Sequence, residues 1–119
     1  VQRAFKLQAK AARVGFDWPD AASIIDKVRE ETDEVAQELA QDPHDKDRLE
    51  DEIGDLMFVA VNLARKCDID PNVALERTNA KFTKRFQWVE DSLRDTDAPV
   101  GKAGLDAMET AWFQAKTKA

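Results

Sequence analysis

The sequence of 119 residues contains a single cysteine, Cys67, so no disulfide within the chain can hold the fold together. Glycine and proline contribute only four residues each, which disfavours disorder and turn-rich all-β folds. No apolar run approaches the roughly 20 residues that span a bilayer, and no secretory leader is recognisable. We therefore expect a helical protein of the cytoplasm, with Cys67 packed in its core.

The sequence lacks several catalytic and binding motifs, and this excludes some classes of function. His44 is the only histidine, so the Glu-x-x-His pairs of a carboxylate-bridged di-iron site are absent from the sequence. There is no glycine-rich phosphate loop, no dinucleotide-binding fingerprint and no Ser or Cys nucleophile with a histidine base. The net charge of −6 argues against a nucleic-acid polymer or an anionic membrane as partner. A small anion that carries Mg²⁺ is compatible, because the metal reverses the local charge.

Apolar periodicity and helix-cap signals predict five helical segments. They cover residues 1–14, 21–41, 45–66, 71–93 and 105–116. Asp20 and Asp70 stand at N-cap positions, and residues 94–104 are predicted as a loop. In the fourth segment the expected core residues are Leu75, Phe82, Phe86, Val89 and Leu93. We expect one all-α domain over residues 1–119, a bundle of four to five helices. The chain starts at Val1 within a helical pattern, which also suits a piece of a longer two-domain protein.

The third segment is apolar on nearly every side after Asp55, from Leu56 to Val61. A helix that is apolar on every side is buried on every side, and in so small a domain this predicts a subunit interface and a homodimer. Gly54 interrupts the same segment, although a glycine inside a helix costs about 1 kcal/mol relative to alanine. Close packing of a neighbouring backbone would explain it, and so would the close approach of a ligand.

Two acidic pairs are the main candidates for chemistry. Glu31 and Glu34 lie in the second segment, and Glu52 and Asp55 in the third, each pair three residues apart on one helix face. Glu31 falls inside the apolar stripe of its segment. An antiparallel turn between the segments would bring the four carboxylates together, and protonation or a cation must then relieve their repulsion. Oxygen ligands favour Mg²⁺, Mn²⁺ or Ca²⁺ over zinc. The alternative is a pair of solvated helix faces.

Basic residues accompany the acidic pairs. Lys27 and Arg48 each precede the first acid of a pair by four residues, an orientation that is poor for an intrahelical ion pair. Each either pairs with that acid or meets an anion bound over the metals. Lys81 and Arg85, one turn apart, suit phosphate groups but also suit an ordinary solvated face. Trp112 is either a core residue or a platform on which a base stacks.

Five stretches of the chain carry a family resemblance. They are Gly15-Phe16-Asp17-Trp18-Pro19, Lys27-x-x-Glu30-Glu31-x-x-Glu34, Glu52-Ile-Gly-Asp55-Leu-Met-Phe, Asn79-Ala-Lys81-Phe82-x-x-Arg85-Phe86 and Met108-Glu-x-x-Trp112-x-x-x-Lys116. Together they resemble the MazG-type nucleoside triphosphate pyrophosphohydrolases of the all-α NTP pyrophosphatase superfamily. The resemblance covers most of the chain and is to the C-terminal catalytic domain of the two-domain bacterial proteins.

The resemblance implies Mg²⁺-dependent hydrolysis of NTPs or dNTPs to a monophosphate and pyrophosphate, with Mn²⁺ as a substitute metal, by a homodimer. The implied metal ligands are Glu31, Glu34, Glu52 and Asp55. The implied nucleotide contacts are Lys81, Arg85, Trp112 and Lys116, with Lys27, Glu30 and the turn from Arg48 to Asp51 bordering the site. Either Glu30 or Glu34 is a candidate to orient or deprotonate the attacking water. Two alternatives stay open: a relative selective for dUTP, dCTP or phosphoribosyl-ATP, and a non-catalytic module that binds nucleotide or protein.

Overall fold

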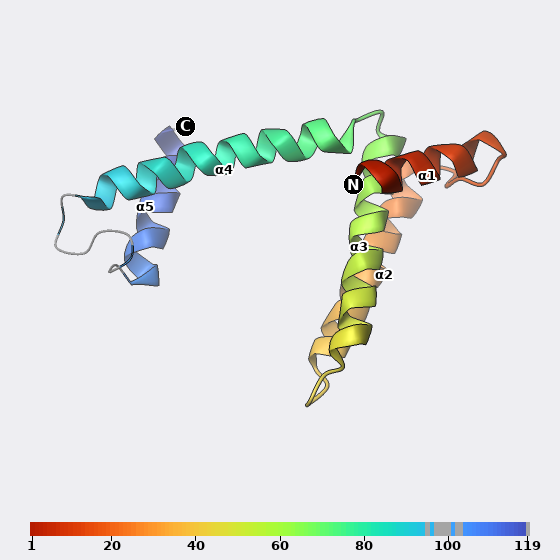
Figure 1. The fold of residues 1–119 in the computed structure, drawn as a ribbon, viewed down its shortest axis with the longest axis horizontal. Coiled ribbons are helices and arrows are strands. Elements are labelled where there is room, and N and C mark those ends of the chain that lie inside the picture. The colour runs from red at the N-terminus through yellow and green to blue at the C-terminus, as the bar shows by residue number, and fades with distance from the viewer. Residues whose placement is uncertain (95, 97–100, 102–103, 119) are drawn as a thin grey trace. The chain divides into compact units, whose positions relative to one another are not determined.

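The computed structural model describes residues 1–94, 96, 101 and 104–118, and the regular secondary structure in these ranges is α-helical (Figure 1). The helices are α1 (Gln2–Arg13), α2 (Ala21–Leu39), α3 (Lys46–Lys66), α4 (Pro71–Arg94) and α5 (Leu105–Lys118). The predicted all-α class is confirmed, and the predicted helix ends agree to within two residues. Most of the predicted loop over residues 94–104 lies outside the described residues. None of the described helices combines the length and apolar character that a bilayer-spanning segment needs.

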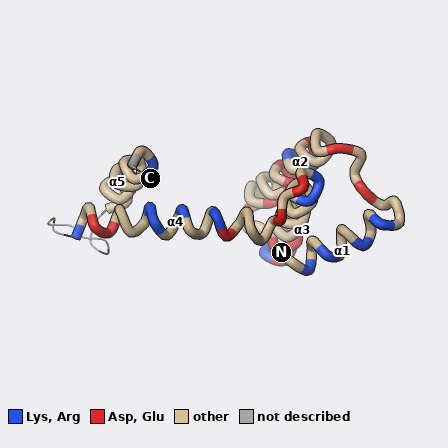
Figure 2. Tube along the Cα trace, turned by 90° about the horizontal axis from the view of Figure 1, so that it is seen from above, with Lys and Arg blue, Asp and Glu red and all other residues tan. Residues whose placement is uncertain are grey.

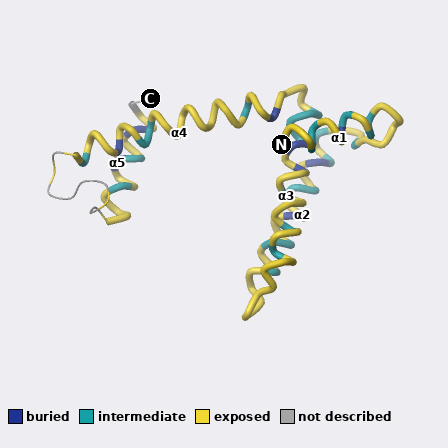
Figure 3. Tube along the Cα trace, in the orientation of Figure 1, coloured by how far each residue is buried: buried dark blue, intermediate teal, exposed yellow. Residues whose placement is uncertain are grey.

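The chain forms two compact units, Val1–Ala74 and Leu75–Ala119. In the first unit, α2 and α3 lie side by side and antiparallel, and α1 packs against α3 (Figure 1). Ile24 of α2 is fully buried and Val59 of α3 is 6% exposed, so the core of this unit follows the α2–α3 interface (Figure 3). This core holds the two helices that carry the acidic pairs in a fixed register.

Local capping signals determine where α2 and α3 begin. The Asp20 carboxylate accepts a hydrogen bond from the Ser23 backbone N–H at 2.8 Å, as the sequence predicts. The Asp45 carboxylate does the same for the Asp47 and Arg48 N–H groups at the start of α3. In the turn between the helices, the Asp45 N–H donates to the Glu38 carboxylate at 3.2 Å. These bonds use backbone groups that the helix leaves unpaired and define the turn that folds α3 back along α2.

An ion-pair group formed by Asp17, Arg65 and Lys66, the Asp17 clamp, ties the connection between α1 and α2 to the end of α3. Asp17 accepts two hydrogen bonds from the Arg65 guanidinium, and the Lys66 ammonium lies 3.3 Å from Asp17 Oδ2. The hydrogen bonds from Arg65, followed by those from the Trp18 N–H and Lys66, lower the pKa of Asp17 well below its ordinary value. The contacts are only partly exposed, with 14% of the Arg65 side chain accessible.

Replacing Asp17 by Asn is expected to lower the melting temperature at neutral pH by several degrees. The folded-state pKa of Asp17 is depressed, so its stabilisation is fully present above the unfolded-state pKa of about 3.9 and is lost as the pH falls towards the folded-state value. The gap between wild type and variant should therefore close below about pH 4. Circular dichroism melts across this range measure it. Asp26→Asn is the matched control, because the Asp26 side chain is 80% exposed in its pair with Arg29. Equal melting temperatures at pH 7 would contradict a role for the clamp.

In the second unit, α5 packs on the C-terminal half of α4. Val89, Ala111 and Ala115 are 1%, 4% and 1% exposed and form the core of this unit. The prediction for α4 is wrong in part: Phe82 is 56% exposed and Leu75 is 49% exposed. Phe82 stays this exposed although its ring contacts Trp112 of α5. The predicted burial of Cys67 is also wrong, since it is exposed at the end of α3.

Candidate active site

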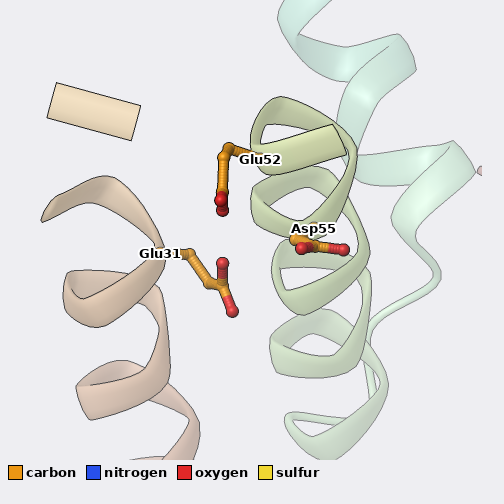
Figure 4. Close-up of side chains that lie close together, drawn as sticks. All are labelled: Glu31, Glu52 and Asp55. Atoms are coloured by element: carbon orange, nitrogen blue, oxygen red, sulfur yellow. The ribbon is translucent and has the colours of Figure 1, made fainter. Parts of the chain in front are cut away.

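Three carboxylates from two helices meet in the first unit. Glu31 comes from α2, and Glu52 and Asp55 come from α3; one oxygen of each lies within 4.8 Å of the others. In Figure 4, Glu31 and Glu52 point towards each other across the gap between the helices. Glu31 is 5% exposed, which confirms the burial expected from its place in the apolar stripe. Asp55 is exposed, so the cluster opens towards solvent on one side.

Two oxygens in this cluster have no hydrogen-bond partner among the described residues. They are Glu31 Oε2 and Glu52 Oε2, and both are buried. An unpaired carboxylate oxygen that has been removed from water costs several kcal/mol, and three carboxylates at this spacing also repel one another. A hard divalent cation fits the set, because it supplies positive charge and takes carboxylate oxygens as ligands. The donor set therefore suits Mg²⁺ or Mn²⁺ and contains no nitrogen or sulfur ligand of the kind that zinc prefers.

Lys27 contacts the cluster through Glu31. Its ammonium lies 3.1 Å from Glu30 Oε1 and 3.2 Å from Glu31 Oε1. The hydrogen bonds to Glu30 and Glu31 raise the pKa of Lys27, so it remains charged at neutral pH. The sequence left two alternatives for Lys27, an ion pair with Glu31 or contact with a bound anion. The structure shows the ion pair within the helix. This contact occupies one oxygen of Glu31 and leaves the other for a further ligand.

The remaining predicted residues of the first unit border the cluster. Glu34 is half-buried, one turn beyond Glu31 on α2, and it does not join the three carboxylates within 4.8 Å. Arg48 lies 4.0 Å from Glu38, across the turn, and does not pair with Glu52; its side chain is 73% exposed. Glu30 is exposed. The structure therefore brings Lys27, Glu30 and three of the four predicted ligands together.

Gly54 lies between Glu52 and Asp55 on α3. A Cβ atom at this position would meet nothing within 4 Å among the residues that the structure describes. Close packing of a backbone from the described part of the chain therefore does not explain this glycine. The position therefore leaves open space beside the carboxylates.

The predicted phosphate-binding residues belong to the second unit. The Arg85 guanidinium lies over the Trp112 ring at 6.0 Å from its centroid, within the range of a cation–π contact. The Phe82 ring packs on Trp112 at a centroid distance of 5.3 Å. Arg85 Nε is buried and unpartnered among the described residues. Lys81 and Lys116 are exposed. Arg85 and Trp112, predicted separately, thus form one group.

Some polar residues of the first unit were not predicted by sequence patterns. Gln8 is 5% exposed and donates from Nε2 to the Phe58 carbonyl at 2.9 Å. Asn62 is 7% exposed and accepts from Arg65 at 3.3 Å. Asn62 stands seven residues after Asp55, on the same face of α3, and this spacing is the only signal of its location in the sequence. The acidic residues of this unit gather on α2 and α3, whereas the charged residues of α1 are all basic (Figure 2).

The fold and the site define a class of protein: an all-α domain in which two antiparallel helices present carboxylates to each other. Comparison with known families is consistent with this class. Residues 19–90 match the MazG nucleotide pyrophosphohydrolase domain, and the chain belongs to this family. The resemblance carried by the five motifs is thereby confirmed.

Two bacterial relatives align over nearly the whole chain. The nucleoside triphosphate pyrophosphohydrolase of Escherichia coli (strain K12) is 41% identical over 116 residues, which cover 98% of this chain and 44% of the relative. The nucleoside triphosphate pyrophosphohydrolase/pyrophosphatase MazG of Thermotoga maritima is 34% identical over 111 residues, 93% of this chain and 42% of the relative. The chain therefore spans less than half the length of these curated relatives.

Proposed function

We propose that this domain hydrolyses nucleoside triphosphates, ribo- or deoxyribo-, to the monophosphate and pyrophosphate with Mg²⁺ as cofactor. The observation that carries the proposal is the pair of buried, unpartnered oxygens on Glu31 and Glu52 beside Asp55. Membership of the MazG nucleotide pyrophosphohydrolase family and the names of the relatives support the same activity. Mn²⁺ is the expected substitute, because it accepts the same oxygen ligands.

The acidic residues have separate roles in this proposal. Glu31, Glu52 and Asp55 would hold the metal, and Glu34, one turn further along α2, would be the fourth ligand. When bound, Mg²⁺ neutralises phosphate charge and lowers the pKa of the attacking water. The water attacks the α-phosphorus, the bond from that phosphorus to the bridging oxygen breaks, and pyrophosphate leaves. Glu30 or Glu34 accepts the proton of the water. Lys27 orients Glu31 through its 3.2 Å contact.

The basic residues bind the phosphates in this proposal. Arg85 presents a planar guanidinium whose orientation is held by Trp112, which suits the oxygens of the leaving pyrophosphate. Trp112 contributes to nucleotide binding through this contact. Lys81, Lys116 and Arg48 are exposed and add charge for the triphosphate. A guanidinium that is already ordered loses little entropy when it binds an anion.

We also propose a homodimer built on α3. Ile53 and Met57 are 42% and 58% exposed, and Ala60 follows them along the same face of the helix. Gly54 lies beside this face with open space around it. An exposed apolar stripe of this kind needs a partner surface, and a second copy of the same helix supplies one.

A nucleotide panel tests the function directly. With Mg²⁺, ribo- and deoxyribonucleoside triphosphates are expected to yield monophosphate and pyrophosphate in equal amounts, and excess chelator should stop the reaction. Anion-exchange chromatography of the products measures this. Diphosphate and inorganic phosphate as products would overturn the proposed bond cleavage. Turnover of a single nucleotide would instead identify a selective pyrophosphatase. Binding without any product would indicate a non-catalytic module.

A further inference from the structure

The first unit contains a second feature that the proposed chemistry does not use: a mostly apolar cavity of about 410 Å³ between α1, α3 and the connection from α1 to α2. Its walls include Leu7 of α1, Phe16 and Trp18 of the connection, and Phe58 of α3. Flat aromatic walls and this volume suit a planar ring system of the size of a purine or a pyrimidine.

Polar side chains reach this cavity at a few defined points. Gln8 and Asn62, both more than nine-tenths buried, line it, as does Arg65. Gln8 spends its Nε2 donor on the Phe58 carbonyl, and its Oε1 has no partner among the described residues. Asn62 spends its Oδ1 on Arg65, and no described group accepts from its Nδ2. The lining thus offers one amide acceptor and one amide donor. The edge of a nucleobase carries donors and acceptors that can pair with them.

The cavity lies next to the carboxylate cluster along α3. Phe58 follows Asp55 by three residues and Asn62 follows it by seven, so all three share one side of the helix. Two turns of helix separate Asp55 from Asn62 by about 10 Å. In a nucleotide, one sugar separates the α-phosphate from the base. A triphosphate held at Asp55 therefore has its base within reach of this cavity.

We infer that the cavity bounded by Leu7, Phe16, Trp18, Phe58 and Asn62 is the base-recognition site for the nucleoside triphosphate. This inference rests on the function proposed above. The base lies between the aromatic walls, the Asn62 amide donates to its edge, and Gln8 offers an acceptor. Arg65 holds the Asn62 amide in this orientation through its hydrogen bond to Oδ1.

The test compares nucleotides with ribose 5′-triphosphate, which has the same phosphates and no base. In the wild type, kcat/KM for the best nucleotide is expected to exceed that for ribose 5′-triphosphate by about 100-fold, since stacking and edge hydrogen bonds each add about tenfold. Asn62→Leu should reduce this ratio about tenfold while leaving the rate for ribose 5′-triphosphate within about twofold. Asn72→Leu is the matched control, because Asn72 is exposed at the start of α4.

A second variant tests the inference if Asn62→Leu does not fold. Phe16 is 81% exposed, so Phe16→Ser removes an aromatic wall at little cost to the core; Val14→Ser, at a residue 85% exposed outside the cavity, is its control. Phe16→Ser should lower the ratio about tenfold and Val14→Ser should not change it. If both cavity variants keep the wild-type ratio, the cavity is not the base site. If they change the oligomeric state on gel filtration and not the ratio, the cavity belongs to a subunit contact and the inference is overturned.

A binding measurement separates failure of this inference from failure of the proposed function. Free adenosine, guanosine, cytidine or uridine should quench the fluorescence of Trp18 in the metal-free protein, and the quenching should disappear in Trp18→Phe. Quenching by nucleosides together with an inactive protein would refute the hydrolase and retain the base site. The opposite outcome would be hydrolysis of nucleotides with no nucleoside-dependent signal from Trp18 and with an unchanged substrate ratio in Asn62→Leu. It would refute the base site and retain the hydrolase.

Discussion

Replacing Glu52 by Gln is expected to lower kcat/KM for nucleoside triphosphates by about 1,000-fold. Glu52 supplies a buried, unpartnered oxygen to the carboxylate cluster, and a neutral amide there neither neutralises a divalent cation nor binds it as strongly. The same change should abolish the rise in melting temperature on addition of Mg²⁺, because that rise is the linkage between metal binding and folding. In metal-free buffer the variant should be at least as stable as the wild type, since repulsion with Glu31 is relieved.

Glu90→Gln provides the comparison for this experiment. Glu90 is exposed on α4, so the same chemical change there should leave both the activity and the Mg²⁺-dependent stabilisation within about twofold of the wild type. Steady-state kinetics and thermal melts with and without Mg²⁺ provide the two measurements. A Glu52→Gln enzyme with full activity and a full response to Mg²⁺ would remove the carboxylate cluster from the mechanism.

Replacing Arg85 by Lys is expected to reduce kcat/KM by about 100-fold with little effect on the fold. The guanidinium of Arg85 lies over Trp112, and its Nε is buried without a partner among the described residues. Lysine keeps the charge but loses both the planar fork that binds two phosphate oxygens and the stacking on the indole. Arg85→Lys therefore separates the geometry of the guanidinium from its charge.

The control for this change is Arg29→Lys, since the Arg29 side chain is 75% exposed on α2. It should leave kcat/KM within about twofold of the wild type. Stopped assays of pyrophosphate release give the rates, and circular dichroism confirms helix content. A wild-type kcat/KM in Arg85→Lys would show that Arg85 acts only as a point charge or does not touch the substrate.

The helices and the burial of Glu31 follow from local information. Asp20 caps α2 through a bond to a residue three positions on, and a helical wheel is enough to place Glu31 in an apolar stripe. The outcome for α4 differs because periodicity shows which side chains share a face but not how much of that face a neighbouring helix buries. Phe82 and Val89 are seven residues apart on one face of α4, yet Val89 is 1% exposed and Phe82 is 56% exposed although it contacts Trp112 of α5.

Long-range pairs are the part of the site that local patterns do not contain. Arg48 meets Glu38 because the turn between α2 and α3 brings them together, whereas spacing alone pointed to Glu52. Asp17 and Arg65 are 48 positions apart, and Gln8 and Phe58 are 50. Such contacts depend on how α1 crosses α3, which is set by tertiary packing and not by the propensity of either segment.

The connection between α1 and α2 is anchored at Asp17 and open at its neighbour Phe16. Asp17 is tied to Arg65 and Lys66, whereas Phe16 is 81% exposed. Asp17 thus attaches the segment to α3, and its neighbour Phe16 provides exposed surface. Mutational drift at Phe16 can alter what this segment touches with almost no penalty in folding, while drift at Asp17 releases the whole segment. Substitutions at position 17 should therefore act on the stability of the fold, whereas substitutions at position 16 should act on what the segment contacts.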